Sequence, residues 1–97
     1  MNNYIRERLQ DAELLAQLAE ETTELGKAAL KLRRVIDGKN PTPVSMAEAF
    51  DNFDEEIADV LLCLEILGYG LKELGLYKAI IDGKRERWVR RLQEAEV

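Results

Sequence analysis

Apolar residues recur at steps of three and four along the first third of the chain. Between Asp11 and Ile36 this spacing places them on one face of a helix. The pattern predicts a long amphipathic helix over residues 11–36. Its apolar stripe consists of Leu14, Leu18, Leu25, Ala28, Leu32 and Val35.

A loop and a second long helix are expected next. The segment 38–43 reads Gly-Lys-Asn-Pro-Thr-Pro, and proline disfavours helix at its own position and at the residue before it. Ser45, with Glu48 three residues later, has the spacing of a capping box and predicts the start of the next helix. We expect this helix to end near residues 68–70. Its apolar stripe consists of Met46, Phe50, Phe53, Ile57, Val60, Leu64 and Leu67.

The end of the chain carries a third helical pattern, which we expect to form a helix although Gly83 should weaken its middle. A short connector over residues 71–75 precedes it. Residues 4–9 predict a short additional helix or the first turns of the long one. The stripe of the last helix consists of Tyr77, Ile81, Trp88 and Leu92.

No segment shows the pattern of a strand, so the predicted fold class is all-α, an antiparallel helical bundle. Residues 1–97 should form one domain, because a hydrophobic core needs most of a chain this short. Residues 57–67 are apolar nearly all round their helix, which is more surface than one packing partner would cover. We therefore expect oligomerisation to complete the bundle, as a two-fold homodimer or a homotetramer.

The composition of the chain argues against several classes of ligand and site. Fourteen basic residues against nineteen acidic ones give a net charge of −5, which argues against binding to a nucleic-acid backbone. No apolar stretch is long enough for a membrane span, and residues 1–10 lack the apolar run of a secretory signal, so we expect a cytoplasmic protein. Cys63 is the only cysteine and histidine is absent, which excludes an intramolecular disulfide and a zinc site of the usual ligands.

Carboxylates interrupt the apolar stripes at a few positions, and these residues are candidates for a functional site. Glu21 falls in the stripe of the first long helix, with Glu20 and Glu24 beside it. On the second helix, Glu56 and Asp59 are three residues apart and share a face, and Asp59 lies inside the apolar run. A carboxylate in a core position has to be paired, protonated or bound to a metal.

Antiparallel packing of the two helices through their stripes would bring these carboxylates together. Like charges so close repel one another, and a hard divalent cation bound by oxygen relieves the repulsion. The pattern therefore predicts a magnesium site, with manganese as an alternative ion.

Glu20 and the basic residues of the last helix also have interpretations that involve no functional site. Glutamates are good helix formers and are mostly exposed, so a solvated face is the favoured interpretation of Glu20 taken alone. Lys84 falls in the stripe of the last helix, with Arg87 one turn on, and both suit phosphate binding. Basic side chains also reach solvent easily and stabilise the C-terminal half of a helix, so both interpretations stay open from the residues alone.

The carboxylates match a pattern of a known family. Glu20-Glu21-x-x-Glu24 followed by Glu56-x-x-Asp59 resembles the EExxE and ExxD pair of the MazG-like, all-α NTP pyrophosphatases. An EExxE string alone is common in glutamate-rich helices. Two carboxylate motifs on successive amphipathic helices, in a chain of this length, are more specific.

The similarity extends over most of the chain. Residues 55–62 resemble the second-motif helix of that family, and Lys84-x-x-Arg87 follows where such proteins often carry a basic segment. The resemblance implies a hydrolase in which water attacks the α-phosphorus of a nucleoside triphosphate, giving the monophosphate and pyrophosphate. Glu20 would be a further metal ligand or the base that orients the water, and Lys84 and Arg87 would contact phosphates. The implied magnesium ligands are Glu21, Glu24, Glu56 and Asp59.

Two other classes of protein also carry acidic residues on helices. A di-iron carboxylate bundle is excluded, because its Glu-x-x-His motif needs histidine. The alternative is a non-catalytic acidic helical interaction module, in which the acidic patches bind a basic partner and the exposed apolar surface is the interface. The residues do not specify which nucleotide is preferred.

Overall fold

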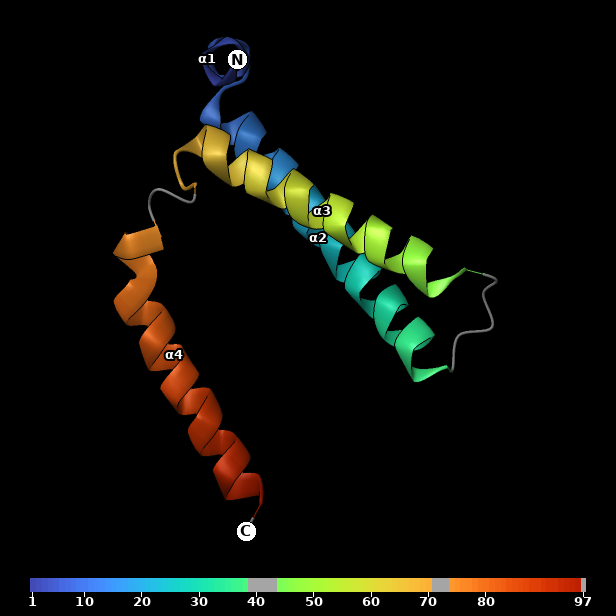
Figure 1. Ribbon diagram of the computed structural model, residues 1–97. Helices are drawn as coiled ribbons and strands as arrows, with labels where there is room; N and C mark the ends of the chain where they lie inside the picture. Colours follow the sequence, from blue (N-terminus) through green and yellow to red (C-terminus); the bar gives the residue numbers. More distant parts are fainter. Residues whose placement is uncertain (39–43, 71–73, 97) are drawn as a thin grey trace.

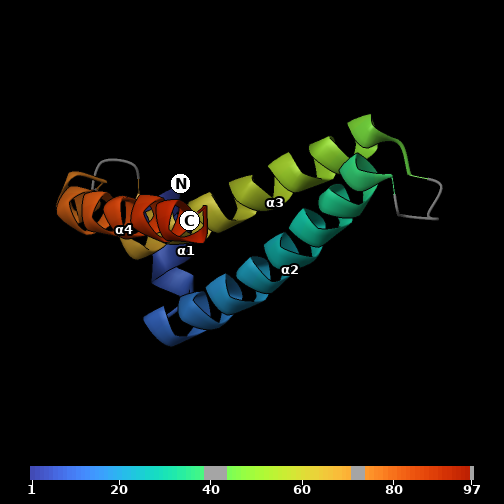
Figure 2. The ribbon, with the colours of Figure 1, turned by 90° about the horizontal axis from the view of Figure 1, so that it is seen from below.

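Two long helices running in opposite directions form the main part of the structure (Figures 1 and 2). A computed structural model describes three stretches of the chain, residues 1–38, 44–70 and 74–96. They form four helices, α1 (Asn2–Arg8), α2 (Asp11–Asp37), α3 (Met46–Leu67) and α4 (Leu74–Ala95). These stretches contain no strand, so the prediction of an all-α fold is confirmed.

Glycines and one hydroxyl group set the ends of the long helices. Gly38 ends α2 with φ of 69°, and Gly68 ends α3 with φ of 95°, in the left-handed region that glycine adopts without a steric penalty. The Ser45 hydroxyl accepts a hydrogen bond from the Glu48 amide at 3.1 Å, which satisfies one free donor at the start of α3. Leu9 is extended, so α1 is a separate short helix. The ends of α2 and α3 agree with those predicted, whereas α1 begins two residues before the predicted stretch 4–9.

Two predicted connections are only partly described. Of the expected loop over 38–43, residues 39–43 lie outside the described residues. Of the expected connector over 71–75, residues 71–73 also lie outside them, while Leu74 and Gly75 already belong to α4. The last helix therefore begins earlier than its apolar pattern indicated.

Helices α2 and α3 pack against each other along a narrow seam. The stripe predicted for α2 is confirmed, since all its members are buried or half-buried. The stripe predicted for α3 was wrong near the start of the helix, where Met46 and Phe50 are exposed and Ala49 is buried instead. At this end of α3 the small Ala49, and not the larger Met46 or Phe50, packs in the seam. The buried residues of the described chain are Leu14, Ala28, Leu32, Ala49, Cys63 and Ile66.

Helix α1 is held against the end of α3 by polar contacts. The Arg6 guanidinium donates to the Ile66 carbonyl, one of the last of α3, and also lies 3.3 Å from the Asp11 carboxylate. Asn2 donates to the Glu65 carboxylate at 3.1 Å. A cation at a helix C-terminus satisfies a carbonyl that has no intrahelical donor.

Helix α4 extends away from the α2–α3 hairpin (Figure 1). It makes no extended packing contact with α2 or α3, and Trp88 and Leu92 are 68% and 57% exposed. The radius of gyration of the chain is 17.3 Å, whereas a compact chain of this length has about 12.5 Å. One chain thus forms an antiparallel pair, with α4 outside it. No described helix has the length and apolarity needed to cross a membrane.

Candidate metal centre

Three carboxylates from α2 and α3 meet in the seam between these helices. One oxygen from each of Glu21, Glu56 and Asp59 lies within 4.8 Å of the other two. We call these three residues the carboxylate cluster. The structure therefore brings together residues of both motifs that the sequence singled out.

Helical periodicity explains why Glu21 points into the seam. It lies seven residues after Leu14 and seven before Ala28, both buried, and seven residues are close to two turns of helix. Glu56 has the same relation to Ala49 and Cys63 on α3. Each buried face thus carries one acidic residue at its middle.

Burial within the cluster differs from the prediction in one respect. Glu21 and Glu56 are half-buried, but Asp59 is exposed. The expectation that Asp59 occupies the buried stripe was wrong, because α3 is rotated so that Ala49, Glu56 and Cys63 face α2. Asp59 reaches the cluster from the edge of the seam.

The surroundings of Glu56 disfavour the charged form of its carboxyl group. Burial raises the pKa of the Glu56 carboxyl above its ordinary value, and the neighbouring carboxylates of Asp59 and Glu21 raise it further. Glu24 and Glu55 add smaller contributions in the same direction. A cation bound among these oxygens would remove the repulsion.

Two neighbours of the cluster were not identified as site residues from the pattern alone. Gln17 Nε2 donates to Glu21 Oε1 at 2.8 Å, one turn away on α2. Cys63 is buried one turn beyond Asp59, and burial raises the pKa of its thiol, with Glu21 and Asp59 adding to the effect. Spacing of four on a helix was the available signal in both cases.

The remaining acidic residues of the first motif lie outside the cluster. Glu24 Oε1 is 3.4 Å from Lys27 Nζ, and the Glu24 carboxylate is among the charges that raise the pKa of Glu56. Glu20 is exposed and does not join the three oxygens.

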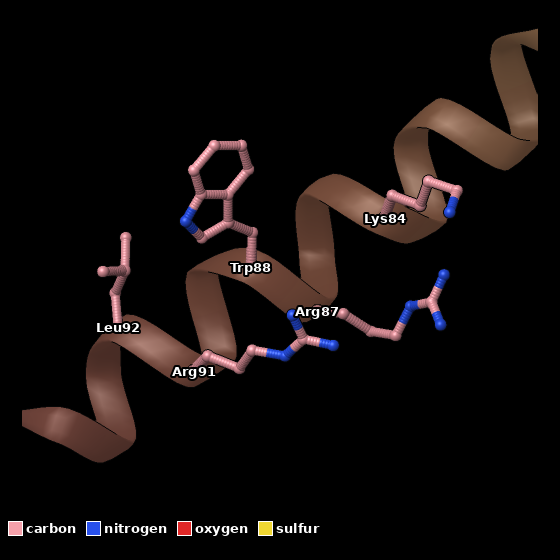
Figure 3. A pocket seen from close by; sticks show the side chains of 5 residues that line it. All are labelled: Lys84, Arg87, Trp88, Arg91 and Leu92. Atoms are coloured by element: carbon pink, nitrogen blue, oxygen red, sulfur yellow. The ribbon is translucent and has the colours of Figure 1, made fainter. Parts of the chain in front are cut away.

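The predicted phosphate contacts lie together on α4 and apart from the cluster. Lys84 and Arg87 line one face of this helix with Trp88, Arg91 and Leu92. Figure 3 shows Trp88 and Leu92 rising from one flank of that face while the arginines extend from the other. Because α4 does not pack on the hairpin, one chain does not place these cations against its own carboxylates.

Ion pairing further distinguishes the basic residues of α4. Asp82 binds Lys78 and Arg85, both at 2.8 Å. In the described part of the chain, Lys84 and Arg87 form no ion pair. Their charges are therefore available to an anionic ligand.

Comparison with known proteins gave no match: no family model, no curated protein and no solved structure is significantly similar to this chain. The resemblance to the MazG-like family therefore depends on the residue pattern alone.

The geometry of the carboxylate cluster fits a hard divalent cation. The three ligand atoms are all carboxylate oxygens, the donor type that magnesium and manganese prefer. Oxygens that share one magnesium ion at about 2.1 Å lie up to about 4 Å apart.

Proposed function

We propose that this protein is a magnesium-dependent nucleoside triphosphate pyrophosphohydrolase. The substrate would be an NTP or a dNTP, and the products its monophosphate and pyrophosphate. The observation that carries the proposal is the convergence of Glu21, Glu56 and Asp59 from two antiparallel helices within 4.8 Å. The paired carboxylate motifs, which resemble those of the MazG-like enzymes, indicate the reaction.

In this proposal the cluster holds magnesium, and manganese substitutes for it. Glu24 lies one turn from Glu21 and is the fourth ligand after its carboxylate turns away from Lys27. Magnesium bound here would neutralise triphosphate charge and lower the pKa of a bound water. Gln17 holds one oxygen of Glu21, which fixes the direction of that ligand.

Glu20 and the cations of α4 act on the substrate. Glu20 is exposed next to Glu21, so its carboxylate is free to orient the attacking water or to serve as a further ligand. Lys84 and Arg87 would bind the phosphates, because charge-assisted hydrogen bonds to phosphate oxygens are among the strongest available to a side chain.

We also propose that the active form is a homodimer or a homotetramer. The described residues of one chain bury few apolar side chains, and large apolar residues of α3 and α4 are left in solvent. Contact between copies would cover this surface.

A panel of ribonucleoside and deoxyribonucleoside triphosphates, assayed for pyrophosphate, tests the function. We expect release from at least one of them with magnesium and none in chelator. Asp59→Asn should abolish the release, whereas Asp54→Asn, an exposed aspartate on the same helix outside the cluster, should not. Orthophosphate release without pyrophosphate would contradict the proposed reaction.

The second candidate is a non-catalytic acidic interaction module. It is favoured by the exposure of Leu61 and Leu62, apolar residues one turn or less from the acidic Asp59. A protein of this kind would bind a basic partner and release no pyrophosphate from any triphosphate. The substrate panel separates the two functions.

A further inference from the structure

We infer that the substrate is a nucleotide whose base carries an exocyclic amino group, and that Glu65 accepts a hydrogen bond from this group. Adenine, cytosine and guanine have such a group, whereas uracil, thymine and hypoxanthine have none. The inference rests on the proposed function, because it gives the substrate class for the same active site.

A hollow near the C-terminal end of α3 suits a nucleobase in its size and its lining. It has a volume of about 200 Å³ and is lined by Leu61, Leu62, Glu65 and Gly70. The two leucines are 45% and 48% exposed, and they offer an apolar wall to the flat face of a base. A Cβ atom at Gly70 would lie 3.4 Å from Cγ of Glu65, so a side chain there would fill space beside the carboxylate.

Glu65 supplies the only polar side chain among the described residues that line this hollow. The Asn2 amide donates to Glu65 Oε2 at 3.1 Å, which restrains the carboxylate, and no described residue donates a hydrogen bond to Oε1. An ionised carboxylate only accepts hydrogen bonds, so it binds an amino group of a base and repels a carbonyl oxygen in the same place. The lining therefore favours bases that carry an amino group.

The position of Glu65 on α3 relates the hollow to the carboxylate cluster. Asp59, Leu62 and Glu65 follow one another at steps of three, so they form a continuous row on the surface of the helix. Neighbours in such a row have Cβ atoms about 5–6 Å apart, which gives about 11 Å from Asp59 to Glu65. This distance is comparable to the length of a nucleotide from its α-phosphate to the far edge of its base. A substrate with its α-phosphate at the cluster would thus extend its base over Leu62 to Glu65.

Two matched pairs of substrates test the role of Glu65. CTP differs from UTP, and ATP from ITP, in carrying an amino group where the other carries a carbonyl oxygen. We expect kcat/KM for pyrophosphate release to be higher for CTP and for ATP by roughly tenfold or more. Glu65→Gln keeps the size of the side chain and still accepts from Asn2, but its amide also donates, so both ratios should fall to about one. Glu48→Gln, which changes an exposed glutamate of α3 outside the hollow, should keep the parental ratios.

Leu62→Ala tests the apolar wall. Loss of this contact should raise KM for both members of each pair by a similar factor, roughly fivefold, and leave the ratios unchanged. An unchanged KM would overturn the placement of the base over Leu62.

The ratio of kcat/KM values within one variant does not depend on how much of that variant is folded. Pyrophosphate release with equal kcat/KM for both members of each pair would overturn only the inference, as would parental ratios kept in Glu65→Gln. If no triphosphate releases pyrophosphate, titration calorimetry with CTP and with UTP, in magnesium, applies the same comparison to the dissociation constants. A preference for CTP that Glu65→Gln loses would then support the base site and overturn only the proposed function. Equal binding of the two nucleotides, or none, would overturn both.

Discussion

Gln17 donates a hydrogen bond from Nε2 to Oε1 of Glu21 at 2.8 Å, across one turn of α2. The acceptor is one of the three carboxylates of the cluster. The contact restrains the Glu21 carboxylate, one oxygen of which lies within 4.8 Å of oxygens of Glu56 and Asp59. A residue in this relation to a metal ligand orients it without touching the metal.

Replacing Gln17 should therefore weaken metal binding. Gln17→Ala leaves the carboxylate free to rotate, and we expect the dissociation constant for magnesium or manganese to rise about tenfold. Titration calorimetry with each ion measures it. Thr22→Ala is the control, because the Thr22 hydroxyl only donates to the Ala19 carbonyl of its own helix. Equal affinity in Gln17→Ala and the parent would show that the hydrogen bond does not position a ligand.

The carboxylate cluster should destabilise the protein when no metal is bound. Asp59→Asn keeps the size of the side chain and removes one of three mutually repelling charges, so its melting temperature in chelator should exceed that of the parent by roughly 2–5 °C. Saturating magnesium should raise the melting temperature of the parent more than that of the variant. Differential scanning calorimetry measures both.

Asp54→Asn is the matched control for this comparison, since it removes an exposed aspartate of α3 that is not in the cluster. It should respond to magnesium as the parent does. If Asp59→Asn lowers the melting temperature in chelator and keeps the activity, Asp59 has a structural role.

The raised pKa of Glu56 predicts a dependence of stability on pH. The folded state binds the Glu56 proton more tightly than the unfolded state, so this group favours folding most below its unfolded pKa of about 4.5. That contribution is lost as the pH rises through the higher, folded pKa. In chelator, the melting temperature of the parent should therefore fall relative to Glu56→Gln as the pH rises from about 4.5 to 7. A difference that is constant with pH would contradict the assigned repulsion.

Lys84→Ala should weaken triphosphate binding and leave metal binding intact. A lysine that binds phosphate contributes to KM, and we expect KM to rise roughly tenfold while the magnesium affinity of the nucleotide-free protein is unchanged. Lys78→Ala is the control on the same helix, because Lys78 is already paired with Asp82. Equal loss of metal and triphosphate binding in Lys84→Ala would remove Lys84 from the phosphate site.

The uncovered apolar surface predicts an oligomer at micromolar concentration. Sedimentation velocity should give a dimer or a tetramer, and Trp88, the only tryptophan, should shift its fluorescence to longer wavelength as dilution dissociates the assembly. A monomer throughout the micromolar range would contradict the oligomer.

The sequence allowed the helix ends and the carboxylate cluster to be predicted for specific local reasons. Gly38 and Gly68 end helices through backbone freedom, and Ser45 begins one through its hydroxyl, all within a few residues of chain. Glu21 was predictable because seven residues separate it from the buried Leu14, and the α2 stripe has only one face.

The rotation of α3 and the surface that covers α4 could not be predicted, because both depend on contacts between segments far apart in the sequence. Residues 57–67 of α3 are apolar nearly all round, so their periodicity fitted more than one rotation of the helix. Glu56, and not Asp59, took the half-buried position. The stripe on α4 correctly predicted a helix, but periodicity does not say which surface covers it. Gln17 and Cys63 each lie four residues from a member of the cluster on their own helix, a spacing that many residue pairs share and that did not single these two out.

Hydrolysis in oxygen-18 water tests the central claim most directly, namely that the carboxylate cluster directs water to the α-phosphorus of a triphosphate. With magnesium and a triphosphate selected from the panel, mass spectrometry of the parent reaction should find the label in the nucleoside monophosphate and none in pyrophosphate. Asp54→Asn should behave as the parent, and Asp59→Asn should reduce the labelled product by roughly a hundredfold or more. Label in orthophosphate or pyrophosphate, or unchanged labelling in Asp59→Asn, would contradict this account.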